Sequence, residues 1–297
     1  MKKIGFIGLG DMGIGMAKNL LRNDFELSGY DVREDRMKAF EKLGGNPAAN
    51  CRMVAETSDA VFVMVLNGQQ VKDVILGNLC LMEGLRRGAT IIITATIHPS
   101  EIKQLVIPLK EKGINLIDSP VSGGKSGAEN GTLTMMVAAK KKIFDDCKSV
   151  LEAVGQNIFH VGEDIGNGQT VKASLQALIG ATFTAIFESL VLGVKSGIKA
   201  ETLYEVFGSS GVSSPLFKNC AKLIMKREFV GTGSHIGTMY KDLGISMNMA
   251  KENGVAMFTA SAAHELFRAG MSLFPDEDNW SIIKLLEQIA GVEVKKR

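Results

Sequence analysis

The chain has 297 residues, of which 45% are hydrophobic and 22% charged, and this composition is typical of a globular protein with about two domains. Its 34 Lys and Arg residues against 32 Asp and Glu leave a net charge of +2, which gives no reason to expect nucleic acid or a membrane surface as a partner. Four cysteines lie far apart without a CxxC pair, as expected for reduced thiols in a cytoplasmic protein: Cys51, Cys80, Cys147 and Cys220.

The first half of the chain alternates two kinds of segment. Short apolar runs predict strands, and apolar residues at helical spacing predict helices. In chain order these are strand 2–9, helix 13–22, strand 26–31, helix 36–44, strands 60–66 and 88–96, helix 99–113, strand 115–121, the apolar segment 132–139, a helix over 141–154 and the short segment 157–162. The alternation predicts a parallel sheet with helices on both faces.

The second half reads as helical throughout. GNGQ (166–169) opens a long apolar helix, and glycines together with Pro215 and Pro275 separate the helical segments that follow. We therefore expect an α/β dinucleotide-binding domain over residues 1–163. An all-helical domain for substrate binding and oligomerisation should follow over 164–297, joined by the long helix.

The long helix is apolar enough to be considered as a membrane span. Between residues 173 and 194 only Gln176 and Glu188 are strongly polar. It is a single candidate, and Thr182, Thr184 and Ser189 are spread along it. These features favour a buried helix of a soluble protein.

A glycine-rich loop follows the first predicted strand. Gly8, Gly10 and Gly13 form GxGxxG, in which the glycines allow a tight turn, close approach of a pyrophosphate and close helix–strand packing. Asp31 ends the second strand about 20 residues later, where a carboxylate accepts hydrogen bonds from a ribose hydroxyl. The pattern predicts a Rossmann domain that binds NAD. Arg33 leaves NADP open, because a nearby arginine can accommodate a 2′-phosphate.

Two further residues complete this loop, Asp11 and Met12, and we expect both to lie against the cofactor. The Asp11 carboxylate is expected to face solvent or the positive end of the following helix.

Four stretches carry a family resemblance: IGFIGLGDMGIGMAKNLL, DSPVSGGKSGAENGTLTMMV, GNGQTVKASLQALIGA and YKDLGISMNMAKENG. In this order they resemble the β-hydroxyacid dehydrogenases, the family of 3-hydroxyisobutyrate, tartronate semialdehyde and 2-(hydroxymethyl)glutarate dehydrogenases. The resemblance implies an oxidoreductase that transfers a hydride between NAD(P) and a small 3-hydroxy acid or semialdehyde in a cleft between two domains. It also implies a homodimer or homotetramer, and no metal.

Lys172 matches the catalytic lysine of that family. Burial disfavours the charged form of a lysine, which suits such a residue to proton transfer near neutral pH. Without the resemblance, a lysine whose amine reaches out to solvent would be the better interpretation.

Gln176 shares a helix face with Lys172, four residues away, and is expected to assist substrate binding. Relatives generally carry asparagine at this position and commonly another just before it, where this chain has Leu175. The longer glutamine points to a different acid or to a weakened enzyme.

By the same resemblance, the Ser-Gly-Gly that ends a strand would bind the substrate carboxylate: Ser122, Gly123 and Gly124. A hydroxyl and backbone N–H groups at the carboxyl edge of a sheet fit that role, although a simple turn explains the same residues.

Other positions correspond to family contacts with the cofactor, namely Leu66, Asn67, Thr96 and Lys241. Asp242 is expected to be structural. Gly15 replaces a proline of many relatives, a change that we expect to have no effect. The four histidines, His98, His160, His235 and His264, show no spacing typical of a metal site.

Three alternatives remain. A cofactor-binding sensor or scaffold with little turnover is compatible with the Leu175 and Gln176 changes. An imine reductase-like relative is disfavoured, because such relatives usually lack the lysine at position 172. A 6-phosphogluconate-type decarboxylase is disfavoured by the short chain and by the lack of a basic cluster for a sugar phosphate.

Overall fold

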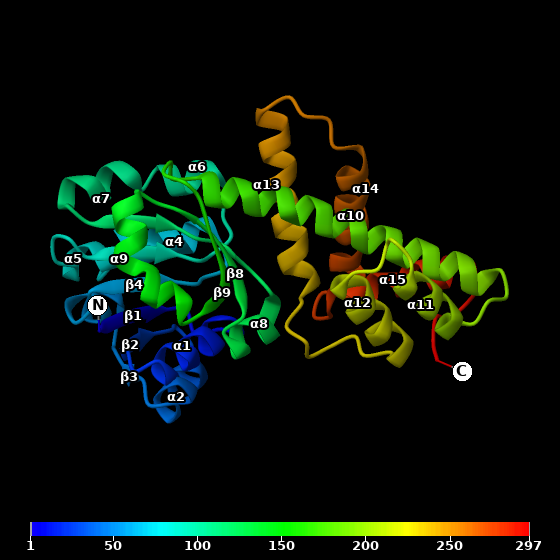
Figure 1. The fold of residues 1–297 in the computed structure, drawn as a ribbon, viewed down its shortest axis with the longest axis horizontal. Helices are drawn as coiled ribbons and strands as arrows, with labels where there is room; N and C mark the ends of the chain where they lie inside the picture. Colours follow the sequence, from blue (N-terminus) through cyan, green and yellow to red (C-terminus); the bar gives the residue numbers. More distant parts are fainter. Residues whose placement is uncertain (1, 297) are drawn as a thin grey trace. The chain divides into compact units, whose positions relative to one another are not determined.

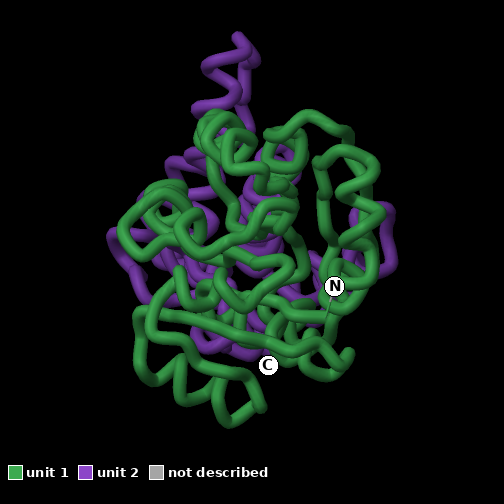
Figure 2. Tube along the Cα trace, turned by 90° about the vertical axis from the view of Figure 1, so that its left-hand side faces the viewer, with its two compact units in different colours: residues 1–172 green, residues 173–297 purple. Residues whose placement is uncertain are grey.

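The computed structural model describes residues 2–296 and divides into two compact units (Figure 2). Unit 1 ends at Lys172 and unit 2 begins at Ala173, inside the long helix α10 (Asn167–Lys195). The sequence predicts a boundary between residues 163 and 164. The units divide later because the first turn of α10 bonds to the sheet of unit 1, where Asp118 accepts the backbone N–H of Gln169.

Unit 1 is built on one twisted sheet (Figure 1). Its strands are β1 (Lys3–Ile7), β2 (Glu26–Tyr30), β3 (Asn46–Pro47), β4 (Ala60–Val63), β5 (Thr90–Ile93), β6 (Asn115–Asp118), β7 (Val121–Ser122), β8 (Leu133–Ala138) and β9 (Gly155–Gly162). The order is β3-β2-β1-β4-β5-β6-β8-β7, with β9 paired to β8. Pairing is parallel from β3 to β6 and becomes antiparallel between β6 and β8. The chain order reverses between β1 and β4, and in such doubly wound sheets ligands bind outside the carboxyl ends of the strands at that point.

The helices of unit 1 connect these strands. They are α1 (Gly13–Arg22), α2 (Glu34–Lys42), α3 (Cys51–Glu56), α4 (Gly68–Leu76), α5 (Leu81–Gly84), α6 (Pro99–Lys103), α7 (Val106–Lys112), α8 (Gly124–Asn130) and α9 (Lys141–Glu152). The expected helix over 99–113 is two helices. Pro108 has no N–H to donate to the carbonyl of Gln104, and the helix breaks at residues 104–105.

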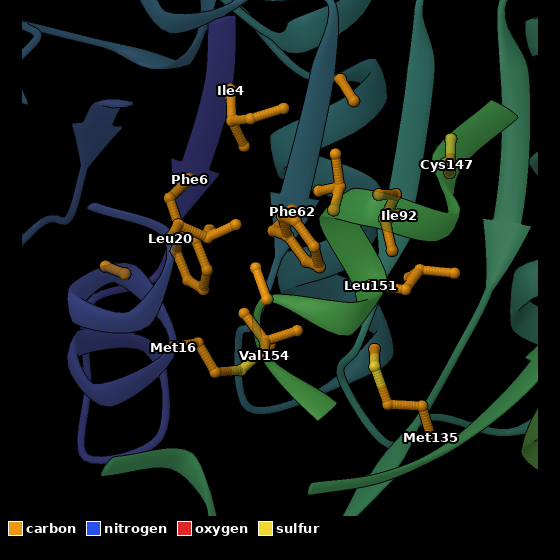
Figure 3. Close-up of a cluster of buried hydrophobic side chains, with 14 of the residues drawn as sticks. Ile4, Phe6, Met16, Leu20, Phe62, Ile92, Met135, Cys147, Leu151 and Val154 are labelled. Carbon is orange, nitrogen blue, oxygen red and sulfur yellow. The ribbon is translucent and has the colours of Figure 1, made fainter. Parts of the chain in front are cut away.

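Alternate residues of the central strands point to two separate cores. Phe6, Phe62, Ile92 and Ile117 are neighbours in the parallel register, and all four are fully buried on one face. Side chains of α1 and α9, among them Met16, Leu20 and Leu151, cover that face together with Val154, which follows α9 (Figure 3). The next residues along these strands, including Ile7, Val63 and Ile93, fill the opposite core with α3, α4, α6 and α7. Burial on both faces explains why these strands read as continuous apolar runs.

Unit 2 is helical, as predicted. Besides the rest of α10 it contains α11 (Ala200–Ser209), α12 (Pro215–Lys226), α13 (Ile236–Glu252), α14 (Phe258–Leu273), the 3₁₀ helix η1 (Asn279–Ile282) and α15 (Ile283–Ala290). Within residues 2–296, α10 is the one helix whose length and composition would allow it to cross a membrane. Phe183, Phe187 and Leu190 of α10 are at most 3% exposed and pack with Phe267 and Trp280 in the core of unit 2. One side of α10 is therefore apolar because it belongs to a protein core.

Candidate active site

The glycine loop lies at the carboxyl end of β1, and each of its three glycines is needed for a different structural reason. Gly8 has φ +90°, and a Cβ there would lie 2.2 Å from the carbonyl oxygen of Met64. A Cβ on Gly13 would lie 1.9 Å from the Gly8 carbonyl oxygen, so neither position accepts a larger residue. Gly10 has no atom within 4 Å of such a Cβ. The loop thus leaves open space at the glycine that the fingerprint assigns to the pyrophosphate, and the residues fit a dinucleotide.

Asp31, at the end of β2, is bound to this loop. Its Oδ2 accepts the backbone N–H of Leu9 at 2.7 Å, and its Oδ1 accepts that of Arg33 at 2.9 Å. Each carboxylate oxygen retains a lone pair, so Asp31 is able to accept ribose hydroxyls as well. The Arg33 guanidinium forms two hydrogen bonds with Asp35, 3.0 and 2.7 Å long, on the exposed surface.

The Asp11 side chain is 32% exposed, and its Oδ1 pairs with Nη2 of Arg36, on α2, at 2.9 Å. Sequence reasoning did not anticipate this ion pair. The pair forms because Arg36 lies in the first turn of α2 beside the loop. Met12 is the N-cap residue of α1 and contributes its side chain to the edge of the unit 1 core.

The change from the family's proline to Gly15 was expected to have no effect, and the packing around Gly15 contradicts that expectation. A Cβ on this residue would lie 2.8 Å from backbone atoms of Ala128 and Glu129, because α1 packs directly against α8. Next to this contact, the buried Asn19 side chain donates to the carbonyl oxygens of Gly15 at 3.0 Å and of Ala128 at 2.7 Å. Gly15 is therefore a packing requirement of this chain.

The other expected cofactor positions in unit 1 lie on loops after β4 and β5. Leu66 is exposed, and its N–H donates to the Gln70 side chain at 2.8 Å. Asn67 is the N-cap of α4, its side chain accepting the N–H of Gln70 at 2.9 Å, so its amide has a structural function. Thr96 is partly buried between β5 and α6.

The expected carboxylate site follows β7 directly. Ser122 is its last residue, and Gly123 and Gly124 have φ of +134° and +60°, conformations that favour glycine. A Cβ on Gly124 would meet no atom within 4 Å. The backbone is therefore accessible at Gly124, as a ligand contact requires.

Lys172 lies in the second turn of α10 and is only 6% exposed. That burial disfavours the alternative of a lysine reaching out to solvent. The helix start that carries it is held by Asp118, whose Oδ2 accepts the N–H groups of Gly166 at 2.9 Å and Gln169 at 3.3 Å. Burial raises the pKa of the Asp118 carboxyl to about 6, and the hydrogen bonds that it accepts limit the rise.

Sequence reasoning missed Asp118 and Gln169 as site residues. Both are 0% exposed, and both belong to the stretches that carry the resemblance, DSPVSGG and GNGQ. Their places in two segments that carry the resemblance are the signal that was available in the sequence.

The remaining expected residues lie in unit 2 and are connected to each other. Gln176 donates its Nε2–H to Oδ2 of Asp242 at 2.6 Å, and Nζ of Lys241 lies 2.8 Å from Oδ1 of the same carboxylate. Asp242 is 2% exposed. The amide of Gln176 is therefore oriented by Asp242, because a carboxylate only accepts hydrogen bonds at neutral pH. No group of three His, Cys, Asp or Glu side chains between residues 2 and 296 is arranged to hold a metal ion.

Comparison with known proteins adds independent evidence. Residues 3–162 match the model for the NAD binding domain of 6-phosphogluconate dehydrogenase, and residues 166–286 match that for the NAD-binding domain of NADP-dependent 3-hydroxyisobutyrate dehydrogenase. The chain is 37% identical to 2-(hydroxymethyl)glutarate dehydrogenase of Eubacterium barkeri, over 98% of this chain and 97% of that protein. It is 31% identical to L-threonate dehydrogenase of Cupriavidus necator, over 97% of each.

Solved structures of other proteins support the same family assignment. A 3-hydroxyisobutyrate dehydrogenase from Salmonella typhimurium superposes with a TM-score of 0.88 at 28% identity, covering 96% of this chain and all of that one. An imine reductase from Myxococcus stipitatus reaches a TM-score of only 0.65 at 16% identity, covering 96% of this chain and 99% of that one, which shows a shared fold alone. The chain belongs to the β-hydroxyacid dehydrogenase family of NAD(P)-dependent oxidoreductases.

Proposed function

We propose that this enzyme oxidises a small 3-hydroxy acid to its semialdehyde, or catalyses the reverse, with Lys172 as the general acid/base. The observation that carries the proposal is the burial of Lys172 on a helix whose first turn is hydrogen-bonded to the carboxyl end of β6. The glycine loop and the Ser122–Gly124 segment belong to the same compact unit. In this scheme residues 1–163 bind the dinucleotide, and residues 164–297 supply further substrate contacts and the oligomer interface.

The residues divide the chemistry as follows. When bound, the nicotinamide supplies the hydride acceptor or donor. Lys172 Nζ takes the hydroxyl proton as the C–H hydride leaves and the carbonyl forms, and it returns that proton to the carbonyl oxygen in reduction. The Ser122 hydroxyl and the backbone N–H groups of Gly123 and Gly124 hold the substrate carboxylate. Thr96 and Lys241 contact the cofactor, and Gln176 contacts the substrate in the orientation that Asp242 imposes.

NAD is the proposed cofactor. The Asp31 carboxylate favours a ribose 2′-hydroxyl and repels a 2′-phosphate, and the Arg33 guanidinium is already engaged by Asp35. We expect kcat/KM for NADH to exceed that for NADPH at least about tenfold. A preference for NADPH would contradict the assignment.

The oligomer is proposed to be a homodimer or homotetramer in the cytoplasm. Large apolar side chains of unit 2 remain exposed in the single chain, including Leu178 and Leu192 on α10 and Phe258 on α14. Light scattering during size-exclusion chromatography tests this directly, and a monomer at micromolar concentration would refute it. All four cysteines are free and buried, which fits a reducing compartment.

The function is tested by following NADH and NADPH absorbance with a panel of 3-hydroxy acids and semialdehydes. Lys172→Ala should lower kcat about 10²- to 10⁴-fold, the usual contribution of a general acid/base. Lys172→Arg should be nearly as inactive, because arginine does not release its proton. Lys195→Ala removes an exposed lysine of the same helix and should leave kcat unchanged. Turnover that survives Lys172→Ala would refute the mechanism, and NADH binding without turnover on any acid would favour a sensor.

A further inference from the structure

The amide of Gln169 uses all of its donors inside the protein. Gln169 is the third residue of α10 and is fully buried. Its Nε2 donates to the carbonyl oxygen of Ala95 at 3.0 Å and to Oδ1 of Asp118 at 3.1 Å. Its Oε1 accepts the backbone N–H of Ile97 at 3.0 Å.

The Gln169 side chain bonds to the segment around Thr96 in the way that a neighbouring strand would. In a parallel β-ladder, one residue bonds to the carbonyl before and the N–H after the residue that it faces. Gln169 makes the same pair of bonds with Ala95 and Ile97, and so it brackets Thr96. The backbone on both sides of Thr96 is thereby tied to α10.

The start of α10 is both hydrogen-bonded to the sheet and packed directly against it. Asp118 accepts both the backbone N–H and the side-chain N–H of Gln169. A Cβ on Gly168 would lie 2.5 Å from the carbonyl oxygen of Met136 and 2.8 Å from that of Asp118, so the helix backbone touches the strands. Lys172 is three residues after Gln169, on the same side of the helix.

We infer that Gln169 is a positioning residue, which sets the placement of Lys172 relative to Thr96 and therefore of the proton acceptor relative to the nicotinamide. The inference rests on the roles proposed above for those two residues. Hydride transfer and proton transfer in one step require both groups at defined positions, and a misplacement of about 1 Å costs about 10²-fold in rate. Gln169 touches neither substrate nor cofactor in this scheme.

The test compares Gln169→Leu and Gln169→Glu with the wild type. Gln156→Leu is the matched control, because it removes the same amide from an exposed site on β9. For each protein we would measure kcat, the NADH Kd by fluorescence, and the Ki of isobutyrate, which has a carboxylate but no hydroxyl to oxidise. Melting temperatures establish that the assays run on folded protein.

Positioning predicts a selective loss. Gln169→Leu should lower kcat about 10- to 100-fold while the NADH Kd and the isobutyrate Ki change less than about threefold. Gln169→Glu keeps the acceptor for Ile97 and loses both donors. Protonation of the introduced carboxyl restores one donor, so its deficit relative to wild type should shrink as the pH falls. Gln156→Leu should match the wild type.

Other outcomes overturn the inference. A lower melting temperature with kcat within about twofold of wild type would show a purely structural amide. Losses of similar size in kcat, NADH binding and isobutyrate binding would show general disorder. If the wild type turns over no hydroxy acid, the proposed function fails. The attachment of Gln169 to the backbone on both sides of Thr96 can still be tested by hydrogen exchange without cofactor. The N–H of Ile97 should then exchange faster in Gln169→Leu than in the wild type, and an unchanged rate would refute the attachment.

Discussion

Asp118 should make unit 1 more stable as the pH falls from 7 to about 4, opposite to the usual behaviour of a carboxylate. Its folded pKa is about 6, raised from 3.8 mainly because burial disfavours the charged form. Between these two values the folded state binds more protons than the unfolded state, so stability is gained on acidification and lost as the pH rises through 6. Asp118→Asn removes the titrating group and keeps its size.

The magnitude follows from the two pKa values. The pKa is about two units higher in the folded state, and each unit corresponds to about 1.4 kcal/mol. The folded state is therefore about 3 kcal/mol more stable when Asp118 is fully protonated than when it is fully ionised. At pH 4.5 about 2 kcal/mol of this is present, and at pH 7.5 almost none. The free energy of unfolding of the wild type, minus that of Asp118→Asn, should therefore increase by about 2 kcal/mol from pH 7.5 to pH 4.5.

Urea denaturation followed by far-UV circular dichroism measures this difference across the pH range. Fluorescence is unsuitable because the single tryptophan, Trp280, lies in unit 2. Other carboxylates titrate equally in both proteins and cancel in the difference. A difference that stays flat from pH 7.5 to pH 4.5 would refute the raised pKa, and one that falls would show that the hydrogen bonds from Gly166 and Gln169 outweigh burial.

Two further predictions concern the packing at Gly15 and the buried hydrogen bond of Gln176. Gly15→Ala should lower the melting temperature by several degrees, since overpacking against the α8 backbone costs about 1–3 kcal/mol, whereas Gly10→Ala, with open space around it, should leave melting unchanged and raise the NADH Kd about tenfold or more. Equal destabilisation by both would contradict this assignment. Gln176→Leu should destabilise unit 2 by about 1–3 kcal/mol, because the buried Asp242 carboxylate loses its amide donor, with little change in NADH affinity. Trp280 fluorescence during urea unfolding reports on unit 2, and an unchanged midpoint would show that the bond contributes nothing.

The local sequence pattern was sufficient to predict the fold class. Continuous apolar runs predicted the parallel strands, which are buried on both faces, and the glycine spacing predicted the dinucleotide loop. The errors in the predicted elements have two causes. Pro108 divided an expected helix into two. The short helices α3 and α4 were not predicted, although their caps, Asn50 and Asn67, are a recognisable signal.

By itself, the sequence determined the family and the two-part architecture, because these depend on residue type and on spacing along the chain. Only the tertiary structure decided which side chains pair with each other. Gln169 and Ile97 are 72 residues apart, Gln176 and Asp242 66, and Asp11 and Arg36 25. No periodicity links such positions. Their pairing follows from the sheet order and the helix packing, which bring a donor and an acceptor together. Where the pair is buried, as for Gln169 and Gln176, removing one partner leaves the other unsatisfied at a cost in free energy.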